Sequence, residues 1–223
     1  GKYYVGDEQA LLKAFWKNRD PRFNRACLYN GREWPVAGRP ADNRMYNALG
    51  VSNADDQYGV NPNAGVNAAN NDIFSGMYNY KVSDLSLTQD KVMTFDIDYI
   101  LMRFAEVMFI YAEAANENGH SDVAIDLLKQ IRKRAGINET SSNPEMKGRV
   151  YGLNPNMNQT EMREAVREER FIELLFEQKR LWDMRRWMIY DKLMNGQGKR
   201  HALVMNKQAD NTYTTYLSVS YTH

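Results

Sequence analysis

Five glutamates on two expected helices have the spacing of a metal centre. Glu169, Glu173 and Glu177 recur every four residues, and Glu106 and Glu113 lie on another segment. Carboxylates at such positions on facing helices can bridge metal ions in helical bundles. That architecture also needs a Glu-x-x-His pair, and neither segment contains a histidine. We therefore predict that these glutamates are structural and bind no transition metal.

The sequence also contains arginines that could pair with these glutamates. Paired charges are the usual way to hold ions near a helical core. The arginines expected near the glutamates are Arg103, Arg132, Arg170, Arg180 and Arg186. We expect an Arg–Glu network.

The sequence shows no recognisable pairing of a nucleophile with a base. The only histidines are His120, His201 and His223, and no Gly-x-Ser-x-Gly motif occurs. Cys27 is the only cysteine, which excludes an internal disulfide and a multi-cysteine metal site. We predict no catalytic residue and no cofactor.

Composition excludes further classes of protein. Lys and Arg number 29 and Asp and Glu 28, so the net charge is +1. This balance predicts neither a nucleic-acid-binding face nor a polybasic membrane patch. The longest apolar run on the best helix, 107–112, is far too short to span a bilayer.

The elements that must position these residues are mainly helical. Helices are expected over 7–18, 98–118, 121–135 and 160–190, with N-caps at Asp7, Asp98, Ser121 and Thr160. At helical spacing, Trp182 and Trp187 are expected in the core. The tail from residue 195 is expected to be irregular, with a weak strand signal in its alternating Leu217, Val219 and Tyr221.

Residues 30–80 have a different composition. These 51 residues include ten asparagines and six glycines among scattered aromatics. So long a segment without helical period is usually functional or disordered, and the aromatics favour order. Its aspartates could bind calcium, but the spacing of an EF-hand loop is absent, and turn chemistry explains them better.

Residues 99–135 are predicted to form an antiparallel helical hairpin. Gly119 provides the turn, and Ala112 and Ala124 are small where the helices would touch. The pattern looks like the centre of a tetratricopeptide hairpin. We find one copy, which cannot stabilise a solenoid alone and must pack on something else.

Three ordered segments of the chain resemble the SusD/RagB family. They are DYILMRFAEVMFIYAEAANENG, AIDLLKQIRKRAG and EERFIELLFEQKRLWDMRRW, and residues 19–23 also look like the family's Asp-Pro-Arg segment. One departure is Gln178, which stands where the family usually has glycine.

The resemblance implies a mainly α fold, with tetratricopeptide-like helical hairpins and long irregular loops packed over one face. Family members are considerably longer, so 1–223 is interpreted as a C-terminal part. Its expected divisions are a loop-rich segment with one helix (1–97), the helical hairpin and long helix (98–190), and an irregular tail (191–223).

The resemblance also implies a function. Family members are surface-exposed lipoproteins of the outer membrane in Bacteroidota that bind nutrients without chemistry. They capture an oligosaccharide and deliver it to a TonB-dependent, SusC-like transporter. Membrane attachment would be only through a lipid anchor outside this chain. The alternatives are a peptide-binding member of the family, a glycoside hydrolase and a helical protein-interaction scaffold.

For a sugar ligand, the loop of residues 30–80 contains suitable side chains. Aromatic rings pack against the C–H face of a sugar, and amide and guanidinium groups bond to its hydroxyls. The predicted ligand-binding residues are Trp34, Tyr46, Tyr58, Tyr78, Asn43 and Arg44. The other interpretation is that these aromatics pin the loop to the helices.

Overall fold

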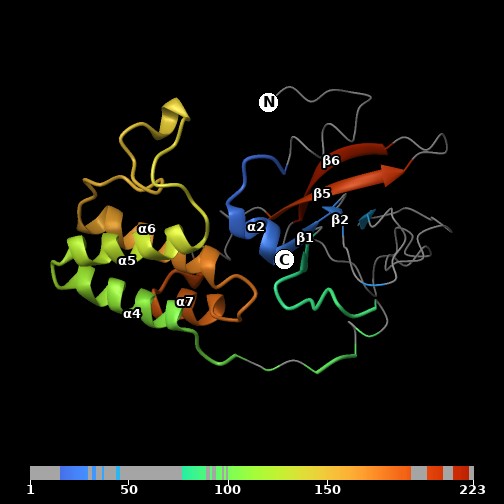
Figure 1. The fold of residues 1–223 in the computed structure, drawn as a ribbon, viewed down its shortest axis with the longest axis horizontal. Helices are drawn as coiled ribbons and strands as arrows, with labels where there is room; N and C mark the ends of the chain where they lie inside the picture. The colour runs from blue at the N-terminus through green and yellow to red at the C-terminus, as the bar shows by residue number, and fades with distance from the viewer. Residues whose placement is uncertain are drawn as a thin grey trace. The chain divides into compact units, whose positions relative to one another are not determined.

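The computed structural model describes residues 16–29, 32–33, 37, 44–45, 77–88, 91, 94–96, 98, 100–191, 200–207 and 213–220. The chain divides into two compact units. One is formed by Asp20–Arg25 together with Asp98–Ile189, and the other by the remaining residues. The expected mainly α fold is confirmed, and the helices labelled α4 to α7 belong to the first unit (Figure 1).

The helical unit is built on a hairpin against which a third helix packs. Helix α4 is Phe104–Glu117, α5 is Ser121–Arg134 and α6 is Gln159–Glu173. Figure 1 shows α4 and α5 side by side, and α6 contacts both. A short 3-10 helix, Pro144–Met146, interrupts the connection from α5 to α6, and α7 is Arg180–Arg186.

The predicted hairpin is confirmed, with its turn at Gly119. Gly119 has φ of 85°, a left-handed conformation that glycine adopts without steric cost. The N–H of His120 donates to the carbonyl of Ala115 at 2.8 Å, which closes α4 with the hydrogen bond of a Schellman motif. Ala112 and Ala124 are both fully buried, so the two helices approach closely where the small residues lie.

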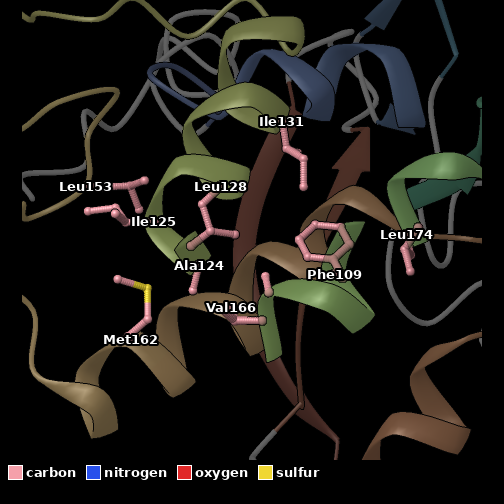
Figure 2. Packing of buried hydrophobic residues seen from close by; sticks show 10 residues of the cluster. Phe109, Ala124, Ile125, Leu128, Ile131, Leu153, Met162, Val166 and Leu174 are labelled. Atoms are coloured by element: carbon pink, nitrogen blue, oxygen red, sulfur yellow. The ribbon is translucent and has the colours of Figure 1, made fainter. Parts of the chain in front are cut away.

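An apolar cluster holds the three helices together, and Figure 2 shows its side chains. Phe109 comes from α4, Leu128 and Ile131 from α5, and Met162 and Val166 from α6. All five are at most 1% exposed. The other side of α4 exposes Phe104 and Tyr111, so the core lies on one face of this helix.

The predicted long helix over 160–190 is wrong. The chain leaves α6 after Glu173 and begins α7 at Arg180. Between them Phe176 and Gln178 have φ of 65° and 60°, the left-handed conformation that interrupts a right-handed helix. Neither Phe nor Gln favours a left-handed conformation, so the sequence does not predict this break.

Two helix starts also differ from their predictions. Helix α4 begins at Phe104, not at Asp98. Helix α6 is capped by Asn158, not by Thr160, in a capping box with Glu161. The Asn158 side chain accepts from the backbone N–H of Glu161, whose carboxylate accepts from the N–H of Asn158.

In the other unit, the described residues form three antiparallel strand pairs. Strand β1 (Cys27–Tyr29) pairs with β4 (Met77–Asn79), and β2 (Arg32–Glu33) pairs with β3 (Arg44–Met45). The third pair, β5 (Arg200–Lys207) with β6 (Tyr213–Ser220), lies in the tail that we expected to be irregular. Eight residues of β5 face eight residues of β6 in antiparallel register, so the weak strand signal at residues 217–221 belongs to a β-hairpin.

The two tryptophans expected in the core differ in their exposure. Trp187 is buried as predicted, but Trp182 is 65% exposed, because α7 turns that side chain away from the core.

Of the expected helix over 7–18, residues up to 15 lie outside the described ranges, and 16–18 form a turn. Within the described part, the helices are too short or too polar to cross a membrane.

Candidate functional site

The structure describes little of the predicted ligand site. Trp34, Asn43, Tyr46 and Tyr58 lie outside the described residues. Arg44 is described only through its backbone, which pairs with Glu33 between β2 and β3. The backbone of Tyr78 likewise pairs with Leu28 between β1 and β4. The ligand site therefore stays a prediction.

The residues that the structure brings together are the charged ones, beginning with Glu169. This carboxylate on α6 is fully buried. Arg132 Nε donates to Glu169 Oε2 at 2.6 Å, and Arg22 Nη2 lies 2.7 Å from Glu169 Oε1. Arg132 also donates to the carbonyl of Tyr151 at 3.0 Å. Two guanidinium groups thus neutralise a charge that burial alone would strongly disfavour.

Glu173, one turn further along α6, has three arginine partners. Arg22 Nη1 donates to Glu173 Oε2 at 3.1 Å, Arg103 Nη2 donates to Glu173 Oε1 at 3.0 Å, and Arg134 also pairs with Oε1. Burial raises the pKa of Glu173, but the hydrogen bonds from Arg22 and Arg103 and the charge of Arg134 lower it by more. The pKa of this carboxyl therefore lies below its ordinary value. Arg103 continues the network to Glu177 through two hydrogen bonds of 2.8 Å.

Arg22 reaches these glutamates from far away in the sequence. Pro21 opens helix α2 (Pro21–Ala26), and Asp20 accepts from the backbone N–H of Arg22 at 2.9 Å. Asp20 also accepts from Arg22 Nε and Nη2, at 2.9 and 2.7 Å, which orients the guanidinium. The Asp-Pro-Arg pattern is visible in the sequence, but it does not identify a partner for Arg22. No local signal in the sequence connects it to α6.

A second cluster joins α4, α6 and α7 around Arg170. Arg170 Nε donates to Asp183 Oδ2 at 2.8 Å, and its Nη2 donates to Glu106 Oε1 at 3.0 Å. Lys179 Nζ lies 3.0 Å from Glu106 Oε2. All three residues of the Arg170 contacts are buried, so the pairs connect the helices inside the unit.

Arg186 extends the second cluster towards the surface. It donates to both oxygens of Glu113, at 2.8 and 2.7 Å, and to Asp183 at 2.9 Å. Trp187 Nε1 donates to the same Glu113 at 2.8 Å. The predicted Arg–Glu network is confirmed for four of the five expected arginines. Arg180 differs, because it pairs with no carboxylate in the part of the chain that the structure describes.

Comparisons with known proteins identify the family of this chain. The family model described as the SusD family matches residues 4–222. The chain belongs to the SusD family.

Two known SusD-like proteins are similar to this SusD-family chain. The SusD-like protein P2 of Formosa agariphila is 35% identical over 102 residues, which are 45% of this chain and 19% of that protein. The crystal structure of a SusD-like protein from Bacteroides fragilis matches with a TM-score of 0.63 and 21% identity. That match covers 98% of this chain and 37% of the other, and it shows the fold alone. The SusD-family chain thus spans well under half of the lengths of these two relatives.

The charged clusters of this SusD-family chain are suited to holding helices together, not to chemistry. A general acid or base must exchange a proton with a substrate, and these carboxylates already accept from guanidinium groups. Among the described residues, no three His, Cys, Asp or Glu side chains lie together as metal ligands. Their arrangement fits a structural role within the helical unit.

Proposed function

We propose that this chain is part of a non-catalytic protein that binds an oligosaccharide at the cell surface and passes it to a TonB-dependent, SusC-like outer-membrane transporter. The observation that carries the proposal is the match to the SusD family over residues 4–222. The protein would be a surface-exposed lipoprotein held at the outer membrane by a lipid anchor. Its ligand is a nutrient glycan.

The charged network supports the non-catalytic part of this proposal. A glycoside hydrolase needs two carboxyl groups that flank the glycosidic bond, one to donate a proton and one to attack or activate water. Glu169, Glu173 and Asp183 are buried and held by arginines. Purified protein should therefore release no sugar from any glycan it binds. Sustained hydrolysis abolished by one carboxylate substitution would contradict this.

We place the ligand on the loop of residues 30–80. Trp34, Tyr46, Tyr58 and Tyr78 would stack on the sugar, with Asn43 and Arg44 bonding to its hydroxyls. Loops carried by a rigid scaffold are where binding residues concentrate. The buried core and paired charges of α4, α5 and α6 provide such a scaffold.

A glycan-array screen of the full-length protein tests the ligand class, with a peptide library as the second arm. If the protein binds peptides and no glycan, the ligand is a peptide and the proposed glycan is wrong. With the strongest glycan found, Trp34→Ala should weaken binding severalfold or more and leave the melting temperature nearly unchanged. Trp182→Ala is the matched control, because that indole is 65% exposed on α7 and should not affect glycan binding. If Trp34→Ala binds normally or unfolds, Trp34 is not a ligand residue.

A further inference from the structure

The loop of residues 30–80 leaves and returns at one end of helix α2. Strand β1 directly follows Ala26, the last residue of α2, and it pairs with β4 near the end of the loop, where Leu28 lies opposite Tyr78. Tyr80 then donates its backbone N–H to the carbonyl of Ala26 at 2.8 Å. Both ends of the loop are therefore tied to the end of α2.

Helix α2 is itself held through Arg22. Arg22 Nη2 lies 2.7 Å from Glu169 Oε1, and Arg22 Nη1 donates to Glu173 Oε2 at 3.1 Å. The side chain of Arg22 is only 12% exposed. Burial lowers the pKa of Arg22, but its hydrogen bonds to Asp20 and the charge of Glu169 raise it by more. The guanidinium therefore stays charged, and both pairs with α6 are retained.

The length of α2 makes these pairs important for the loop. A helix of six residues is too short to be stable alone, so its geometry depends on tertiary contacts. A loop binds with full affinity only in molecules that already hold the binding arrangement, and the apparent affinity falls with the fraction that do. Because the loop begins and ends at α2, loosening α2 should lower that fraction through the chain itself.

We propose that Arg22 is a positioning residue for the ligand loop, because its pairs with Glu169 and Glu173 hold the helix at whose end residues 30–80 leave and return. This inference rests on the proposed function, in which that loop carries the ligand. Arg22 acts through the chain and does not contact the ligand.

The affinity of the full-length protein for the strongest glycan of the array tests the proposal. Arg22→Gln should weaken binding roughly threefold to tenfold, because fewer molecules hold the loop in its binding arrangement. Arg132→Gln is the matched control for stability, since Arg132 also pairs with Glu169 but belongs to α5. Arg25→Gln, at an exposed position of α2, controls for the change in charge. Both controls should bind like the wild type at a temperature where circular dichroism shows every variant folded.

Hydrogen exchange followed by mass spectrometry provides a second readout that needs no ligand. The amide of Tyr80 should exchange faster in Arg22→Gln than in the wild type or Arg132→Gln, because its hydrogen bond to Ala26 opens more often. If Arg22→Gln does not fold, Arg22→Lys takes its place. Lysine keeps the charge but lacks the fork that reaches both glutamates, so its effects should be smaller and in the same direction.

Wild-type affinity or unchanged exchange at Tyr80 in Arg22→Gln, or an equal loss of affinity in Arg132→Gln, would overturn the proposal. Wild-type behaviour of Arg22→Lys would do so where that variant replaces it. If no glycan binds, the proposed function is wrong, and the exchange at Tyr80 still decides the role of Arg22. If Trp34→Ala weakens binding and Arg22→Gln does not, the loop carries the ligand without help from Arg22.

Discussion

Glu169 shows how a charge can be kept inside this fold. Its side chain is inaccessible to solvent, and Arg22 and Arg132 contact one oxygen each. Removing a charge from water is expensive, and the pairing offsets that cost only while every partner is present. The network therefore specifies one arrangement of the helices more than it adds net stability.

Glu169→Gln should reduce the free energy of unfolding by roughly 3–5 kcal/mol, because two partly buried guanidinium groups would lose the counter-charge that they share on a fully buried carboxylate. Urea denaturation followed by circular dichroism measures this change. Glu164→Gln is the control on the same helix, since Glu164 is exposed and its pair with Arg167 spans 3.3 Å at the surface. An equal loss in both variants would contradict the structural role of Glu169.

Glu173 should make stability depend on pH in the acidic range. Its folded-state pKa is lowered by its arginine partners despite burial. The stabilisation is therefore complete above the unfolded-state pKa, about 4.3, and is lost as the pH falls through the lower folded-state value. Urea denaturation of the wild type should show the free energy of unfolding decreasing below about pH 4.3. Glu173→Gln should be less stable at pH 7 and show a shallower decrease. If the free energy of unfolding of Glu173→Gln falls with decreasing pH as steeply as that of the wild type, other carboxyl groups cause the decrease.

At the scale of elements, the turn between α6 and α7 decides where the second cluster forms. It reverses the chain so that Asp183 returns to Arg170, thirteen residues earlier. Gln178 adopts φ of 60° there, at the position where the SusD resemblance expects glycine. A residue with a Cβ is strained in this conformation by about 1–2 kcal/mol.

Gln178→Gly should therefore raise the free energy of unfolding by up to about 1 kcal/mol. The relief of strain exceeds the extra chain entropy that glycine loses on folding, about 0.5–1 kcal/mol. Thermal and urea denaturation both report the gain. Gln178→Ala removes the same amide but keeps the Cβ, so it should bring no gain. If alanine stabilises as much as glycine, backbone strain is not the cause.

At the scale of the whole molecule, Arg22 connects parts of the chain that are distant in sequence. Its hydrogen bond to Glu173 spans 151 residues, and residues 20–25 belong to the same compact unit as 98–189. The helical unit is therefore not a continuous stretch of sequence. Its internal charges depend on a segment that precedes the whole loop of residues 30–80.

A double-mutant cycle between Arg22→Gln and Glu169→Gln should give a coupling free energy of about 1–3 kcal/mol, because the two groups are in contact, Glu169 is fully buried and Arg22 is only 12% exposed. The measurement is the free energy of unfolding of both single variants, the double variant and the wild type. The same cycle on Arg163 and Glu117, whose side chains are 27% and 42% exposed, should give a much smaller coupling. Additive effects of Arg22 and Glu169 would show that their contact contributes nothing.

The sequence by itself determined the hairpin of α4 and α5. Its apolar positions, the small Ala112 and Ala124 and the turn at Gly119 are local signals, and local chain geometry converts them into structure. The sequence also indicated that the glutamates pair with arginines, since buried carboxylates need counter-charges. The ligand residues predicted from composition remain a proposal.

Only the tertiary structure decided which arginine pairs with which glutamate and where the last helix breaks. Arg22 meets Glu169 and Glu173 through a fold that joins distant segments. Gln178 adopts a left-handed conformation that its residue type disfavours, and Trp182 is exposed on α7, which begins after that break. These outcomes depend on packing between elements. Helical periodicity reports only which residues share a face within one element.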